Sequence, residues 1–210
     1  MAGVNLNDII YLTPNSEQRE PAVQLPDGRV IFVRHPSAEE LERIYAHTQT
    51  EISPSVASWD TVKKADKHNP DTFWGVFLAT DNTRNNVSMI GYYSFLHLNE
   101  SGRVALEGGT FDAVHLDFSQ LVEEGKRPSV IYVWAILARK VARIATPLVA
   151  KALGKNRYGG VPIYATAATL GGLNSMKGYG FVGARPSEKG VGDLFRLDPE
   201  PGQSDKTAAA

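Results

Sequence analysis

Cysteine is absent from all 210 residues of the chain. Its absence excludes disulfide bonds, thiolate metal sites and a cysteine nucleophile, and it is typical of proteins from a reducing compartment. The N-terminus also lacks the basic segment and apolar run of a secretory leader. The longest apolar run, residues 130–138, is far shorter than the roughly 20 residues that cross a bilayer. We therefore expect a cytoplasmic protein without a membrane-spanning segment.

Acidic residues are missing from residues 125–187, a stretch that holds ten of the 22 basic residues. The rest of the chain carries all 23 acidic residues, so the net charge of −1 is a cancellation between two unequal regions. This asymmetry predicts an anion site in the C-terminal half; the alternative is a basic face balanced by acidic neighbours in the fold. The composition is otherwise that of one globular domain, which excludes wholesale disorder, collagen and coiled coil.

Hydrophobic periodicity and turn residues predict an alternation of strands and helices. The predicted strands are residues 30–34, 72–79, 87–98, 103–107, 129–137, 161–167, 181–184 and 194–197. The predicted helices follow Ser37, Ser58, Thr146 and Thr169. Residues 1–28 are expected to be an irregular N-terminal extension, 29–198 a single domain and 199–210 a disordered tail. Hairpin strands followed by a β-α-β crossover indicate an α/β (α+β) fold with a mixed sheet and helices on its faces.

Two of the predicted helices begin with capping signals. Ser37 and Glu40 have the spacing of a capping box, and Thr146 followed by Pro147 matches an N-cap and the first helical residue. Before the second of these helices, the strand at residues 129–137 is continuously apolar, which predicts burial on both of its faces.

Residues 129–154 combine this apolar strand, a short basic loop and the Thr146 helix. A helix start exposes backbone N–H groups that bind phosphate, and Arg139, Lys140 and Arg143 would add positive charge there. The glycine spacing of a Walker loop or a dinucleotide fingerprint is absent from this unit. It therefore predicts a phosphate site without the usual glycines, and the alternative is a structural corner with solvated arginines.

Residues 29–198 resemble the GNAT superfamily of acetyl-CoA-dependent N-acetyltransferases. The resemblance rests on the strand at 131–137, the loop and helix at 139–153, the strand at 163–167 and the ending at 176–181. The order of elements also matches, including two early helices and a hairpin. The resemblance implies a mixed, mostly antiparallel central sheet flanked by helices on both faces. It also implies acetyl-CoA as co-substrate, held beside the strand at 131–137, and no metal.

The cofactor-binding residues are implied by the same resemblance. They are Ile136, Leu137, Ala138, Arg139, Lys140, Arg143, Ile144, Ala145, Thr146 and Thr169. The first three would lie beside the pantetheine and Thr169 near the cofactor, whereas the pyrophosphate would meet the loop and helix start between them. Arg143 replaces a glycine of the family pattern, so its side chain either blocks the backbone from phosphate or pairs with the phosphate.

The catalytic residues are implied only in part. Met176 stands where the family often has a tyrosine acid, so Tyr179 would be the substitute proton donor; the alternative for Tyr179 is a packing role. A glutamate at the end of a central strand is typical of the general base, and Glu107 is the candidate. The alternative bases are Asp112, His115 and His97.

The resemblance implies an enzyme that transfers the acetyl group of acetyl-CoA to a primary amine of a small molecule or peptide by direct attack. A cationic amine would be favoured by acidic residues of the first helical region, namely Glu39, Glu40, Glu42 and Glu51; the alternative is that they form a solvated helix face. The alternative is a GNAT-like binding or regulatory protein without catalysis, which Arg143 and Met176 favour. Nucleic acid is disfavoured as a partner, because no recognition motif accompanies the basic residues. The sequence leaves open a homodimer and the role of residues 108–127.

Overall fold

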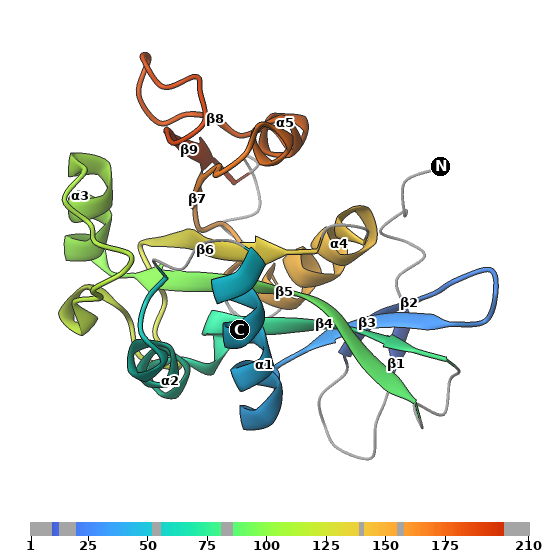
Figure 1. The fold of residues 1–210 in the computed structure, drawn as a ribbon. Coiled ribbons are helices and arrows are strands. Elements are labelled where there is room, and N and C mark those ends of the chain that lie inside the picture. Colours follow the sequence, from blue (N-terminus) through green and yellow to red (C-terminus); the bar gives the residue numbers. More distant parts are fainter. Residues whose placement is uncertain are drawn as a thin grey trace, which may run out of the picture.

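The structure, a computed structural model, describes residues 10–12, 20–51, 56–80, 86–138, 141–154 and 158–199. Within these ranges nine strands form one sheet in the order β1-β2-β3-β4-β5-β6-β7-β9-β8 (Figure 1). The strands are β1 (Ile10–Leu12), β2 (Glu20–Gln24), β3 (Val30–Arg34), β4 (Phe73–Ala79), β5 (Val87–Leu98), β6 (Val130–Leu137), β7 (Ile163–Thr166), β8 (Val182–Gly183) and β9 (Leu194–Leu197). Of the described pairs, β6–β7 alone is parallel, so the sheet is mixed and mostly antiparallel, as predicted.

Helices cover both faces of this sheet, which confirms the predicted fold class. They are α1 (Ala38–Glu51), α2 (Trp59–His68), α3 (Glu100–Gly108), α4 (Ala142–Leu153) and α5 (Leu170–Gly178), with short 3-10 helices η2 (Pro70–Thr72) and η3 (Phe118–Gln120). On one face, α4 packs over Ile31, Val33 and Val76; on the other, α1 and α2 pack over Phe73 and Tyr92 (Figure 1). These layers hold together because each fully buried apolar side chain contributes about 1.5–3 kcal/mol.

The N-terminal segment differs from the predicted irregular extension, because β1 and β2 lie within residues 1–28. Ala22 and Val23 of β2 are buried, and both pair with β3. Pro21 does not prevent the strand, since it lies next to the strand's first residue, where a missing N–H is tolerated. The hairpin to β3 closes with a 2.7 Å hydrogen bond from Leu25 N–H to the Arg29 carbonyl. The sheet therefore extends to the N-terminal side of the predicted boundary at Arg29.

The predicted capping box of the first helix is present, and the second early helix also begins with a serine cap. Ser37 N–H donates to Glu40 Oε2 at 2.7 Å, and Glu40 N–H donates to Ser37 Oγ at 3.3 Å. The same carboxylate accepts two hydrogen bonds of 2.8 Å from Arg34, which lower the pKa of Glu40. Helix α2 begins after Ser58, whose hydroxyl accepts from Thr61 N–H at 3.1 Å. The spacing of Ser37 and Glu40 was sufficient to predict the first of these caps, because the contact lies within one helical turn.

Residues 103–107 form part of helix α3, and the prediction of a strand there is wrong. Asn99 caps this helix, since its Oδ1 accepts from Gly102 N–H at 3.0 Å. Gly109 ends it with a left-handed backbone of φ +77°, a conformation that glycine adopts without strain. Leu106 is buried below the helix and packs with Leu96 and Leu98 of β5. The helix is thus defined by its cap, its terminal glycine and the buried contact of Leu106. The prediction failed because the apolar pattern of so short a segment fits a strand as well as a helix.

Helix α4 begins at Ala142, one turn before the predicted start at Thr146. Pro147 consequently lies inside the helix, where it removes one backbone hydrogen bond. Burial of the helix face, including Ala145, Leu148 and Val149, offsets that loss. The Thr146 hydroxyl does not cap the helix but lies 2.7 Å from the Tyr93 hydroxyl. Tertiary packing therefore overrides the local Thr-Pro signal.

Candidate active site

Strands β6 and β7 pair over three residues and then part. Their register runs Ile131–Ile163, Tyr132–Tyr164 and Val133–Ala165, and β6 continues beyond it to Leu137 paired with β5 alone. The polar backbone of this last segment of β6 consequently has no strand partner on the β7 side in the described part of the chain. Backbone N–H and C=O groups require hydrogen-bond partners, so the parted edge is suited to an extended ligand with amide groups.

The end of β6 is more exposed than its apolar sequence predicts. Val130 and Ile131 are buried, but from Tyr132 onward the strand is only partly buried, and Ile136 is 46% exposed. The prediction of burial on both faces is therefore wrong for this half of the strand. The ladder with β5 shifts between Ser94 and Phe95, which leaves Trp134 as an extra residue of β6. Its Nε1 donates to the Ala113 carbonyl at 2.9 Å, which tethers residues 109–117 against β6.

The start of α4 follows directly after the end of β6. Val141 is its N-cap residue and, in the described structure, makes no side-chain cap; its N–H donates to the Ala138 carbonyl at 3.0 Å. Arg143 lies in the first helical turn, is exposed and has no carboxylate partner among the described residues. Positive charge beside a helix N-terminus attracts an anion. Arg139 and Lys140, the other predicted cations, lie outside the described residues.

The remaining residues predicted at the pyrophosphate loop contact the protein interior. Ala145 is fully buried and Ile144 packs against the core on the α4 face. The hydroxyl of Thr146 meets that of Tyr93, and burial raises the pKa of Tyr93 to about 12.

Helix α5 carries the predicted residues from the far side of the parted strands. Thr169 is its N-cap, and its Oγ1 accepts from Gly172 N–H at 3.1 Å. Met176 packs against the buried residues Leu173 and Phe195, whereas Tyr179 follows the helix and is 45% exposed. The exposed phenol of Tyr179 is therefore available to solvent or ligand, while Thr169 and Met176 have structural contacts.

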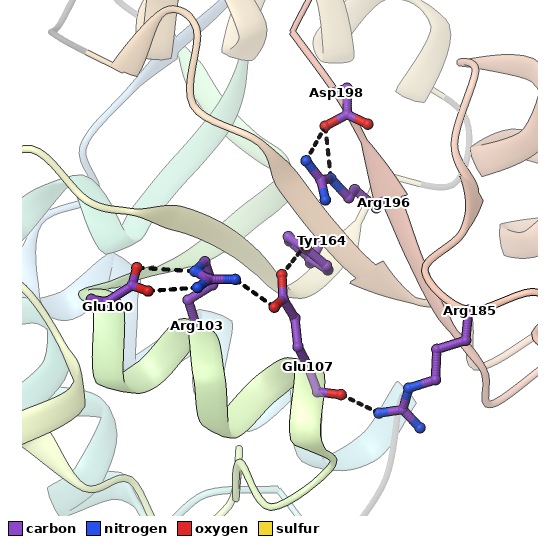
Figure 2. Close-up of polar contacts among 7 residues, drawn as sticks. All are labelled: Glu100, Arg103, Glu107, Tyr164, Arg185, Arg196 and Asp198. Carbon is purple, nitrogen blue, oxygen red and sulfur yellow. Dashed lines mark hydrogen bonds and ion pairs between the residues drawn. The ribbon is translucent and has the colours of Figure 1, made fainter.

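Glu107 lies on helix α3 and not at a strand end (Figure 2). One carboxylate oxygen accepts from the Tyr164 hydroxyl at 2.5 Å, and the other accepts from Arg103 at 2.5 Å. Its backbone carbonyl accepts from Arg185. Both carboxylate oxygens of Glu107 therefore already accept hydrogen bonds from other side chains, which a substrate amine would have to displace. The role of Glu107 as a general base stays a prediction that these contacts do not favour.

The three alternative bases occupy different environments. Asp112 accepts from the backbone N–H groups of His115 and Val114, and these bonds lower the pKa of Asp112 to about 2. His115 is exposed and lies 3.0 Å from Asp112 on the loop after α3. His97 is buried against Tyr158 on the α4 face, and burial lowers its pKa to about 4. The structure does not bring these residues together with Glu107 or Tyr179.

Sequence reasoning missed Tyr164 and Arg185, which join Glu107 in one polar cluster (Figure 2). Tyr164 belongs to a strand predicted from its apolar residues, and only its need for a hydroxyl partner could have indicated a polar contact. The structure also has no helix that is long and apolar enough to span a membrane within the described residues. Those residues include no cluster of three or more His, Asp or Glu side chains that could hold a metal ion.

No protein-family model matches the sequence, and no curated protein matches it. The structure is similar to the crystal structure of the GNAT domain of S. lividans PAT, with a TM-score of 0.52 and 14% sequence identity. The similarity covers 85% of this chain and 96% of that one. At this identity the similarity concerns the fold, so the chain has a GNAT-like fold.

Proposed function

We propose that this chain is an N-acyltransferase that binds acetyl-CoA where β6 and β7 part and transfers the acetyl group to a primary amine. The observation that carries the proposal is the parted edge of β6, which is exposed at Ile136 and is followed in the sequence, after four intervening residues, by the start of α4. An extended chain with amide groups, an apolar stem and terminal phosphates complements these three features. The GNAT-like fold supports the same assignment.

Each part of the proposed site has a separate role. The backbone of residues 134–137 would pair with the pantetheine amides, and Ile136 would be covered by the ligand. The first turn of α4 and Arg143 would hold phosphate through backbone N–H groups, the helix dipole and a charge-assisted hydrogen bond. Lys140 and Arg139, which stand next to this turn in the sequence, would add to the positive charge.

The transfer itself requires two proton movements. The amine loses a proton as its nitrogen attacks the thioester carbonyl, and the departing thiolate gains one. Met176 cannot supply a proton, whereas the exposed phenol of Tyr179 can. Glu107 is held by Tyr164 and Arg103, so Tyr179 is the better supported of the two catalytic candidates.

A non-catalytic GNAT-like binding protein is the second candidate. Two observations favour it. Both carboxylate oxygens of Glu107 already accept hydrogen bonds, and Met176, which packs against Leu173 and Phe195, stands where the resemblance would place the family's tyrosine acid. Such a protein would bind acetyl-CoA at the same parted edge without turning it over.

A cationic acceptor receives partial support from the acidic face of α1. Glu40 is held by Arg34 and by the capping box, so its charge is neutralised locally. Glu39 and Glu42 remain exposed on the helix, whereas the side chain of Glu51 lies outside the described residues. A polyamine or lysine-like amine would therefore meet two exposed carboxylates on α1.

Titration calorimetry with acetyl-CoA and CoA tests the proposal. We expect both to bind the wild type, and Arg143→Ala to weaken binding about tenfold, the factor that a lost charge-assisted hydrogen bond of about 1.5 kcal/mol corresponds to. Lys63→Ala is the matched control, because Lys63 is an exposed cation on α2 that pairs with Asp60. Absence of acetyl-CoA binding by the wild type would overturn the proposal. Binding without thioester turnover over a panel of amines would favour the non-catalytic alternative.

A further inference from the structure

Helix α3 connects the two sides of the parted sheet. We define the C-terminal arm as β7, α5, β8 and β9, which continues the sheet beyond β6 (Figure 1). The main-chain ladder between this arm and β6 has three residue pairs. Glu107 of α3 adds two polar links to the arm: its carboxylate accepts from Tyr164 of β7, and its carbonyl accepts from Arg185, which follows β8 (Figure 2).

Tyr164 lies close to the point where β6 and β7 part, so its contact with Glu107 can affect the position of β7 there. Tyr164 precedes Ala165, the last residue of β7 that pairs with β6. A small rotation of β7 at this point would displace everything that follows it in the arm, including Thr169 and Tyr179. Because the Tyr164 hydroxyl donates to a charged acceptor at 2.5 Å, the contact fixes both the distance and the direction of β7 relative to α3.

The contact is buried on the Tyr164 side and held in place on the Glu107 side by neighbouring residues. Tyr164 is 1% exposed and packs with Leu96, Leu98 and Leu106, so its ring cannot move without disturbing that core. Burial, together with the hydrogen bond to Glu107, raises the pKa of Tyr164 to about 12, which keeps its hydroxyl a donor at physiological pH. On α3, Arg103 holds the second oxygen of Glu107, and Glu100 in turn holds Arg103.

We propose that Glu107, Tyr164 and Arg185 form a polar brace that sets the separation of β6 and β7 and thereby the affinity for acyl-CoA. This inference rests on the proposed function, because the separation matters through the ligand that would lie between the strands. The brace residues are positioning residues and do not take part in the chemistry. The brace also gives α3 a structural role. Through its buried apolar side chains and its polar cluster, the helix connects the segment between β5 and β6 to the C-terminal arm.

Pulsed EPR distance measurements test the brace without any ligand. The chain has no cysteine, so spin labels at Ala150→Cys on α4 and Ser175→Cys on α5, both exposed, attach only where they are placed. We expect a narrow distance distribution in the otherwise unchanged chain and a broader or longer one after Tyr164→Phe or Arg185→Ala. Glu100→Ala is the matched control: it removes the outer ion pair of the cluster, leaves the contacts of Glu107 in place and should leave the distribution unchanged.

Calorimetry on the unlabelled variants tests the link to affinity. We expect Tyr164→Phe and Arg185→Ala to bind acetyl-CoA about tenfold more weakly, as for the loss of one hydrogen bond, with kcat at saturating acetyl-CoA nearly unchanged. A large fall in kcat after Glu107→Gln, with binding retained, would indicate a general base and overturn the brace. Unchanged distance distributions in both brace variants would also overturn it. If the distributions change but the wild type binds no acetyl-CoA, the proposed function fails while the brace geometry stands.

Discussion

Two histidines on the α4 side of the sheet, His97 buried and His35 partly exposed, respond to pH in opposite directions. His97 is 2% exposed, and neither ring nitrogen has a hydrogen-bond partner within the described residues. Burial lowers its pKa to about 4 from 6.5. Burial also lowers the pKa of His35, but the hydrogen bond and charge of Asp71, 3.2 Å away, outweigh this effect and raise the pKa overall. His35 therefore adds stability at low pH that is lost as the pH rises through its folded-state pKa. His97 has the opposite effect, because the free energy of unfolding falls as the pH drops below the pKa of the unfolded histidine.

The contribution of His97 predicts a loss of stability in acid. Between pH 6.5 and 4 the unfolded chain protonates this side chain and the folded chain does not, which costs up to roughly 3 kcal/mol. His97→Phe keeps a ring against Tyr158 and removes the titration, so its free energy of unfolding should fall less over this range than that of the wild type. Urea unfolding at a series of pH values measures the difference. His115→Ala, at an exposed position, is the control, and parallel curves for wild type and His97→Phe would contradict the prediction.

At the scale of elements, caps decide where several helices begin. Asn99 Oδ1 accepts from Gly102 N–H and from the Ser101 hydroxyl, and its Nδ2 donates to the Ser119 carbonyl at 2.7 Å. The residue thus caps α3 and also ties the helix to η3. Since α3 carries Glu107, this cap supports the polar cluster as well as the helix. The sequence contains the cap residue, but the contact with Ser119 is 20 residues away and depends on the fold.

Replacement of the cap should destabilise the protein measurably. For Asn99→Ala we expect a loss of about 1–2 kcal/mol in the free energy of unfolding, the usual range for an N-cap. The measurement is chemical denaturation followed by far-UV circular dichroism. Ser101→Ala is the matched control, because it removes one hydroxyl that bonds to Asn99 and leaves the capping bond in place. Equal effects of the two substitutions would show that the cap contributes little.

At the scale of the whole molecule, the sheet is continuous from the N-terminal strands to the C-terminal arm. β2 supplies Ala22 and Val23 to the core and forms the lateral neighbour of β3. Val23 packs in the same cluster as Ile31, Leu148 and Val149. Helix α4, which begins the proposed phosphate site, therefore rests partly on a strand that precedes the predicted domain boundary. The position of the site depends on this N-terminal edge.

A chain shortened to the predicted domain should be much less stable. Starting the chain at Arg29 removes β1 and β2 and exposes the side of β3 and the face of α4 that they cover. We expect a loss of about 2–5 kcal/mol or more, comparable to truncating a large core side chain, as measured by urea unfolding. A chain that starts at Ile10 keeps both strands and is the control. Equal stability of the two shortened chains would mean that β2 is dispensable.

The sequence by itself determined the elements whose signals are local: the strands β3, β4 and β5, the capping box of α1, and the starts of α2 after Ser58 and of α5 after Thr169. It also indicated the GNAT-like order of elements and the basic stretch that contains the start of α4. Only the tertiary structure decided that β2 joins the sheet, that α4 begins before Pro147 and that Glu107 meets Tyr164 and Arg185. These outcomes depend on burial and on contacts between residues far apart in the chain, such as the 57 positions between Glu107 and Tyr164. The parting of β6 from β7, on which the proposed site rests, was also decided by the tertiary structure alone, because the separation of two strands depends on what packs on either side of them.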